Sequence, residues 1–97
     1  MSSLEKPSRE VDKDFIAFVH ERSCAVCYTV PVDAHHLKTR ATGGSDYTCV
    51  PLCRFHHDSW HRLGDRKFSD VHGVNLWKVN ADLLRRYIGE RLRGDRE

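Results

Sequence analysis

The chain has 97 residues and a mass of 11.3 kDa, which leaves room for one small domain. Its mean hydropathy is −0.61, no apolar run reaches the roughly 18 to 20 residues of a membrane helix, and the N-terminus lacks the apolar core of a signal peptide. The sequence therefore rules out a membrane span and predicts a cytoplasmic protein. The net charge of +2 is too small to indicate a nucleic-acid partner by itself.

Positive charge is nevertheless concentrated in one part of the chain. Residues 1–34 carry 4 basic and 6 acidic side chains (−2), whereas residues 35–97 carry 12 basic and 8 acidic ones (+4). A phosphate backbone bound by the second region would account for this distribution. Ordinary solvated surface charge accounts for it equally well.

The first predicted elements are a flexible tail and a helix. Residues 1–9 are polar and should be mobile. From Glu10 onward, apolar residues recur at helical spacing, which predicts a helix over about 10–22 with one apolar stripe, formed by Val11, Phe15, Phe18 and Val19.

The middle of the chain alternates in a pattern typical of strands. Residues 34–50 predict two strands joined by a loop that contains Gly43 and Gly44. A helix over 54–63 follows, with Gly64 placed to end it. The order strand, loop, strand and helix is a ββα unit, and the fold class expected is α+β.

The C-terminal third predicts a second amphipathic helix. A short turn is expected over 69–73, the helix over about 76–92, and a frayed tail over 94–97. Trp60 and Trp77 are both expected in the core, as large apolar side chains.

Cysteine and histidine are unusually frequent, with 4 Cys and 7 His. Cysteines stay reduced in the cytoplasm, which favours metal binding over a disulfide framework. Two pairs have the spacing by which a turn offers two ligands to tetrahedral zinc, and together they form a complete ligand set: Cys24, Cys27, Cys53 and His56. Buried thiols without metal are the alternative. Cys49 could replace Cys53 or His56, but its looser spacing assigns it to the core.

A second set of potential ligands consists of histidines. His57 and His61 are four residues apart on the predicted helix, so both imidazoles project from one face. If His56 were the helical ligand instead, its partner four residues on would be Trp60, which binds no metal. His56 therefore belongs to the zinc set, and the second set is His35, His36, His57 and His61. His20 and His72 have no partner at ligand spacing and are expected to be bystanders.

Taken in chain order, these motifs resemble those of the HNH nucleases. The resemblance covers residues 24–63: a C-x-x-C pair, the His35-His36 pair, Gly43-Gly44, and the run from Val50 that ends in H-x3-H at His61. The H-x3-H spacing is also similar to that of the colicin-type DNases. The resemblance implies a zinc-braced ββα-metal (His-Me finger) core over about 34–64, within a single nuclease domain over 10–93 with flanking N- and C-terminal helices.

The resemblance also implies residue roles. His35, His57 and His61 would bind one divalent cation, and His36 would be the general base. Nitrogen ligands suit Mn²⁺, Ni²⁺, Co²⁺ or Zn²⁺ better than Mg²⁺, so Mn²⁺ is expected to serve well, with Mg²⁺ as the alternative. His35 and His36 point to opposite faces of a regular strand, and they can share a site only if the strand bends or ends there.

One position departs from the family pattern. Thr48 stands where the family has an asparagine that orients the base, and its hydroxyl could make one such bond. Thr48 is therefore included as a catalytic candidate, with Asp46 as a nearby alternative and an ordinary strand threonine as the other interpretation.

The resemblance implies a metal-dependent DNA endonuclease that nicks one strand of duplex DNA. Basic residues near the motif could hold the phosphate or be plain surface: Lys38, Arg40, Arg54 and Arg62. A monomer would nick, whereas duplex cleavage would require a homodimer or two successive nicks. The alternative function is a non-catalytic, zinc-stabilised DNA-binding module in which the histidines only pack.

Overall fold

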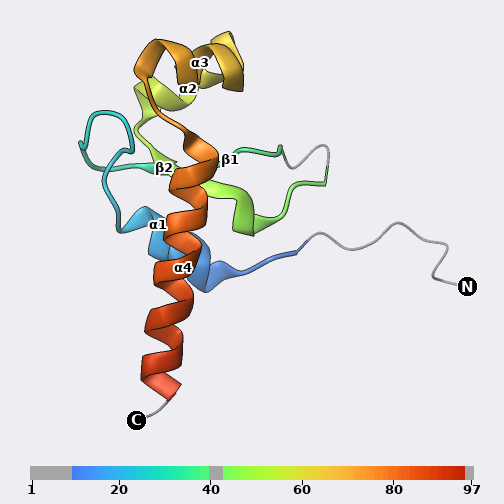
Figure 1. The fold of residues 1–97 in the computed structure, drawn as a ribbon, viewed down its shortest axis with the longest axis vertical. Coiled ribbons are helices and arrows are strands. Elements are labelled where there is room, and N and C mark those ends of the chain that lie inside the picture. Colours follow the sequence, from blue (N-terminus) through green and yellow to red (C-terminus); the bar gives the residue numbers. More distant parts are fainter. Residues whose placement is uncertain (1–9, 40–42, 96–97) are drawn as a thin grey trace, which may run out of the picture.

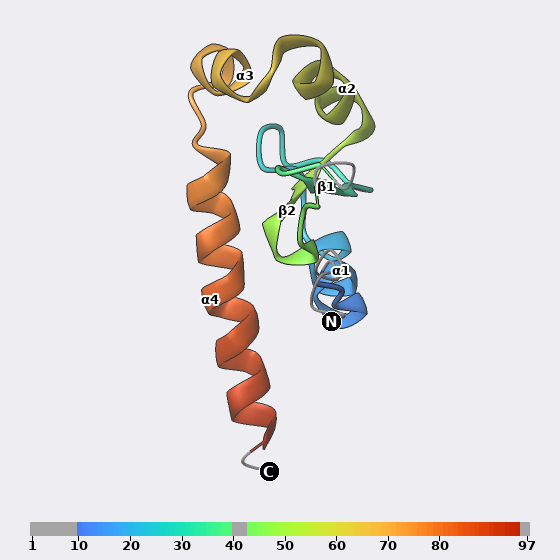
Figure 2. The same cartoon turned by 90° about the vertical axis from the view of Figure 1, so that its right-hand side faces the viewer.

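The computed structural model describes residues 10–39 and 43–95, which form an α+β fold. The elements along the chain are α1 (Lys13–His20), β1 (Asp33–His36), the 3-10 turn η3 (Asp46–Thr48), β2 (Cys49–Leu52), α2 (Arg54–Leu63), α3 (Asp65–His72) and α4 (Leu76–Asp95) (Figure 1). In Figure 2, α2 lies above the two strands, α1 lies below them, and α4 runs along one side. In the described part of the chain, no helix is both long and apolar enough to cross a bilayer.

The two predicted strands are confirmed as an antiparallel pair. His35 lies opposite Val50 and His36 lies opposite Cys49. After the loop, the backbone at Gly44 lies against the backbone of Lys38, which follows β1. A Cβ added to Gly44 would lie only 1.8 Å from the Lys38 carbonyl oxygen. Only glycine fits there, which explains why the loop carries it.

The apolar side chains form two buried clusters on either side of this sheet. One joins the first loop and the strands to the helices α2, α3 and α4: Cys24, Val32, Leu37, Val50, Leu52, Trp60, Phe68 and Leu76. The other joins the sheet to α1 and α4: Phe15, Phe18, Val19, Cys49, Leu83 and Tyr87. The predicted core positions of Trp60 and Cys49 are confirmed.

Helix α2 has the predicted bounds, and the other helices differ from prediction at their ends. Gly64 follows α2 with a φ of 87°, which lets the chain turn directly into α3. Helix α1 begins only at Lys13, because the Asp12 carboxylate caps it by accepting the Phe15 N–H at 3.0 Å, and this leaves Val11 outside and exposed.

Two expectations for the C-terminal third are wrong. A full helix, α3, replaces the short turn over 69–73, and its buried anchor is Phe68. Trp77 is 46% exposed, because the adjacent Leu76 occupies the inward position at the start of α4. Of the tail expected to fray over 94–97, residues 94 and 95 form the end of α4. The expected tail over 1–9 and residues 96–97 lie outside the described residues.

Asp12 joins three elements by hydrogen bonds, and its replacement should destabilise the fold. Besides capping α1, its carboxylate accepts the Tyr47 hydroxyl at 2.6 Å and the Tyr87 hydroxyl at 3.2 Å. The bond to Asp12 raises the pKa of Tyr47 to about 12. We expect Asp12→Ala to lower the free energy of unfolding by about 2 to 4 kcal/mol, as the cap and two tyrosine partners are lost.

The measurement is urea unfolding at saturating zinc, and the matched control is Asp14→Ala. Asp14, two residues after Asp12, is exposed and pairs with the exposed Arg91 at 3.3 Å, so that variant should lose about 0.5 kcal/mol or less. Equal losses in the two variants would contradict the central position of Asp12.

Candidate metal centres

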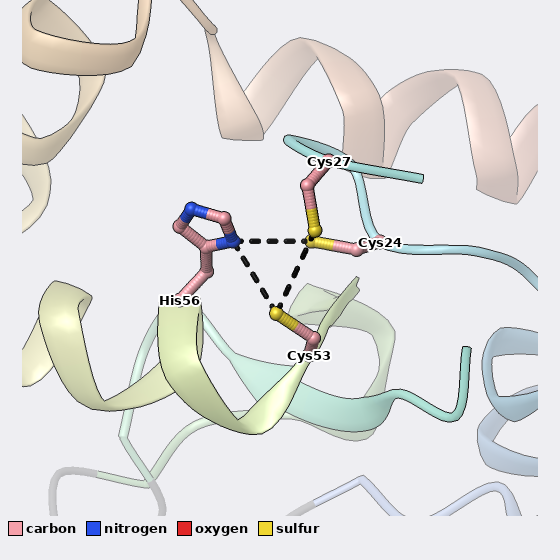
Figure 3. A group of neighbouring side chains, drawn as sticks. All are labelled: Cys24, Cys27, Cys53 and His56. Carbon is pink, nitrogen blue, oxygen red and sulfur yellow. Dashed lines mark hydrogen bonds between the residues drawn. The ribbon is translucent and has the colours of Figure 1, made fainter. Parts of the chain in front are cut away.

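Four predicted zinc ligands meet beside the start of α2. Cys24 and Cys27 come from the loop after α1, Cys53 is the residue before α2, and His56 lies in its first turn. Figure 3 shows the three sulfurs and the His56 ring turned toward one another. Their ligand atoms all lie within 4.8 Å of one another, so this group, the cysteine cluster, could hold a metal such as zinc.

The distances within the cysteine cluster test this fit. The sulfurs of Cys27 and Cys53 are 3.8 Å apart, and His56 Nδ1 lies 3.3 Å from the sulfur of Cys53 and 3.7 Å from that of Cys24. Tetrahedral zinc with sulfur ligands at about 2.3 Å separates its ligand atoms by roughly 3.5 to 3.8 Å. The cluster therefore has the size of a zinc site.

One exposed member of the cysteine cluster, Cys27, lies where its thiolate form is favoured, and the thiolate is the form that binds zinc. The hydroxyl of Thr29, 3.0 Å from the sulfur, is the main cause that lowers the pKa of Cys27 to about 6. Burial instead raises the pKa of Cys53. The Val26 N–H donates to the sulfur of Cys24 at 3.4 Å, and Ala25 is bonded to Pro51, which ties the C-x-x-C loop to β2.

Three predicted ligands of the second cation also meet, and we call them the histidine cluster: His35, His57 and His61. His35 comes from β1 and is 2% exposed, while His57 and His61 come from successive turns of α2. The His35 ring centroid lies 4.4 Å from that of His57 and 5.2 Å from that of His61. The three rings line a cavity of about 300 Å³ together with Ala34, His36 and Thr39.

The ring nitrogens of this cluster fit a cation. His35 Nε2 is buried without a hydrogen-bond partner among the described residues. An unpaired buried polar atom costs about 1 to 3 kcal/mol, which coordination to a metal would offset. Burial, followed by the neighbouring His57 and His61, lowers the pKa of His35 to about 3, so its nitrogen lone pair stays available.

Asp33 belongs to this site, although our sequence analysis did not include it. Its Oδ2 lies 3.0 Å from His57 Nδ1 and 3.0 Å from the guanidinium of Arg54, in contacts not aligned as hydrogen bonds. Burial lowers the pKa of His57 more than the Asp33 charge raises it. The sequence feature that could have identified Asp33 is its position two residues before His35, because residues two apart on a strand have their side chains on the same face.

His36 lies at the same cavity, and the expected conflict with His35 does not arise because β1 ends at His36. The Nε2 atom of His36 is 3.0 Å from Asp46 Oδ1. The expectation that Thr48 orients this ring is wrong, because the Thr48 hydroxyl donates to the Ser45 carbonyl at 2.8 Å. Asp46, the nearby alternative, makes the contact instead.

The candidate DNA-binding residues are only partly gathered at the site. Arg54 pairs with Asp33, which in turn contacts His57 of the histidine cluster. Lys38 is exposed just after β1. Arg62 donates to the Ser59 hydroxyl at 2.9 Å, and Arg40 lies outside the described residues. The bystanders have other contacts: His20 Nδ1 is 3.0 Å from the Val32 carbonyl, and the His72 ring packs 5.0 Å from that of His56.

Residues 2–87 match the model of a family described as "Protein of unknown function (DUF968)". The chain belongs to this DUF968 family. It is 32% identical over 94 residues to "Uncharacterized protein YdfU" of Escherichia coli (strain K12), an alignment that covers 92% of this chain and 25% of that relative. The chain thus spans about a quarter of the length of that relative. No solved structure is significantly similar to this DUF968 chain.

Proposed function

We propose that this DUF968 chain is a metal-dependent DNA endonuclease that nicks one strand of duplex DNA. The observation that carries the proposal is the cavity lined by four histidines: three have ligand nitrogens within 4.8 Å of one another, and the fourth is paired with a carboxylate. The resemblance of residues 24–63 to the HNH nucleases supports the same assignment.

The two clusters differ in chemistry and so in proposed role. Three thiols and one imidazole, a complete set of four ligands, suit a structural zinc ion. Three imidazoles leave coordination positions open, which suits a catalytic cation such as Mn²⁺, with Mg²⁺, Ni²⁺ or Co²⁺ as alternatives. When bound by the histidine cluster, that cation would act as a Lewis acid and stabilise the negative charge on a phosphodiester.

The residues of the chain supply the proton transfer and the orientation. His36 would accept the proton of the attacking water, because one ring nitrogen is held by Asp46 and the other keeps a lone pair. Asp33 holds His57 against the cavity, and Arg54 and Lys38 place positive charge beside it for the DNA backbone.

The direct test is the incubation of supercoiled plasmid with the zinc-loaded protein and Mn²⁺, Mg²⁺ or EDTA. We expect conversion to the open circular form with Mn²⁺ and none with EDTA. His36→Ala should lower the nicking rate by about 10²-fold to 10⁴-fold without changing the metal content, since His36 is not a ligand. His20→Gln, which changes a histidine outside the cavity, is the matched control and should nick normally.

The alternative function predicts a different result from the same experiment. A zinc-stabilised DNA-binding module would shift the mobility of DNA fragments but leave the plasmid supercoiled with every metal. One observation favours this alternative: the buried His35 ring packs against Trp60, with 4.4 Å between the ring centroids, as expected if the histidines only fill the core. Supercoils that persist in all metals would overturn the nuclease proposal.

A further inference from the structure

Asp46 lies buried beneath the candidate base, and both of its carboxylate oxygens face a nitrogen. Oδ1 is 3.0 Å from His36 Nε2, and Oδ2 accepts the backbone N–H of Asp12 at 2.9 Å. The residue is 5% exposed. A buried carboxylate held at both oxygens has one orientation, and it therefore imposes that orientation on the ring beside it.

The support under Asp46 comes from separate parts of the chain. The Asp12 backbone is fixed because its side chain caps α1 and accepts the hydroxyls of Tyr47 and Tyr87. Tyr47 is the residue after Asp46 in η3, and Tyr87 belongs to α4. The ring of His36 is thus connected through Asp46 and Asp12 to the helices that pack against the sheet.

We propose that Asp46 is the positioning residue for His36 and fixes its neutral ring as the Nε2–H tautomer, with Nδ1 as the proton acceptor. An ionised carboxylate can only accept hydrogen bonds, so the shared hydrogen must belong to His36 Nε2. The lone pair then lies on Nδ1. This inference rests on the proposed function for its consequence in catalysis, but the tautomer itself does not depend on nuclease activity.

The same geometry predicts what an amide would do at this position. In Asp46→Asn, the Asp12 N–H still requires an acceptor, so the amide oxygen takes the place of Oδ2. The amide NH₂ group then faces His36 Nε2 and donates to it, which places the ring hydrogen on Nδ1. An asparagine would therefore invert the tautomer rather than merely loosen the ring.

The test is nitrogen NMR of the imidazole rings in zinc-loaded, histidine-labelled protein without DNA, with His36 assigned by His36→Gln. We expect Nε2 of His36 to be protonated and Nδ1 to have the shift of an unprotonated nitrogen at a pH where the ring is neutral. Asp46→Asn should exchange the two shifts. In the plasmid assay it should lower the nicking rate by about 10²-fold or more at unchanged KM and metal content.

Two further arms make the outcome decisive. Asp70→Asn, an exposed acid on α3, is the matched control and should leave both the shifts and the nicking rate unchanged. If His36 in the wild-type protein carries its hydrogen on Nδ1, the proposal is overturned even if Asp46→Asn does not fold. If the tautomers are as expected but the wild-type protein nicks no DNA, only the proposed function fails.

Discussion

Removal of the proposed structural zinc with a strong chelator is expected to unfold the protein. The ligands of the cysteine cluster link the loop after α1 to the start of α2, and Cys24 itself is fully buried in the apolar cluster below α2 and α3. Zinc binding by such sites contributes on the order of 10 kcal/mol in small zinc peptides. A domain of this size has a total stability of about 5 to 15 kcal/mol, so the loss should exceed what the small core provides.

The unfolding can be followed by circular dichroism and by tryptophan fluorescence, because Trp60 is buried in the same apolar cluster as Cys24. Cys24→Ser should fold poorly in the same way, even in excess zinc. The matched control is Cys49→Ser, since Cys49 is equally buried but lies in the other apolar cluster. That variant should keep its zinc and lose only about 1 to 3 kcal/mol. A native spectrum for the protein without zinc would contradict the structural role of the cysteine cluster.

Replacement of His57 by alanine is expected to abolish nicking and to remove one metal ion per chain. His57 is one of the three candidate ligands in the histidine cluster, and two imidazoles would hold a divalent cation far more weakly than three. We expect the nicking rate at fixed Mn²⁺ to fall by at least about 10³-fold. Elemental analysis after loading with Mn²⁺ should show zinc unchanged and manganese lost.

Two other variants on the same structure show whether His57 acts as a ligand. Asp33→Asn keeps all ligands but removes the charge 3.0 Å from His57 Nδ1, and it should lower metal affinity by about 10-fold to 100-fold. Asp82→Ala removes an exposed acid on α4 that pairs with Lys78 and Arg85, and it should leave metal affinity unchanged. Full manganese binding by His57→Ala would remove this residue from the site.

Short, characteristic spacings predicted the members of the cysteine cluster and the His57–His61 pair, whereas the ligand role of His35 came from the resemblance to the HNH nucleases. One C-x-x-C pair and one C-x-x-H pair supply the four members of the cysteine cluster, and the spacing of four on a helix places His57 and His61 on one face. Helix α2 was predicted to the residue because Gly64 ends it. These features depend on local geometry alone, which the chain order reveals directly.

The features that the sequence left open, such as the choice between Asp46 and Thr48, or did not reveal, such as Asp33, depend on contacts between distant segments or on competition between neighbours. Asp33 acquires its role only when β1 meets α2, and Asp46 only when η3 meets both β1 and Asp12. Trp77 and Leu76 are both apolar, and only the docking of α4 decides which of them is buried. The η3 turn carries no periodicity that distinguishes Asp46 from Thr48 as the partner of His36.

The adjacent residues His56 and His57 join the two metal centres through a single helix. His56 completes the cysteine cluster, and the next residue belongs to the histidine cluster. Zinc at the first centre would therefore set the rotation and position of α2, and with it two of the three ligands of the second. The metals should load in order: zinc first, and the catalytic cation with full affinity only afterward, because each binding event is linked to the same placement of one helix.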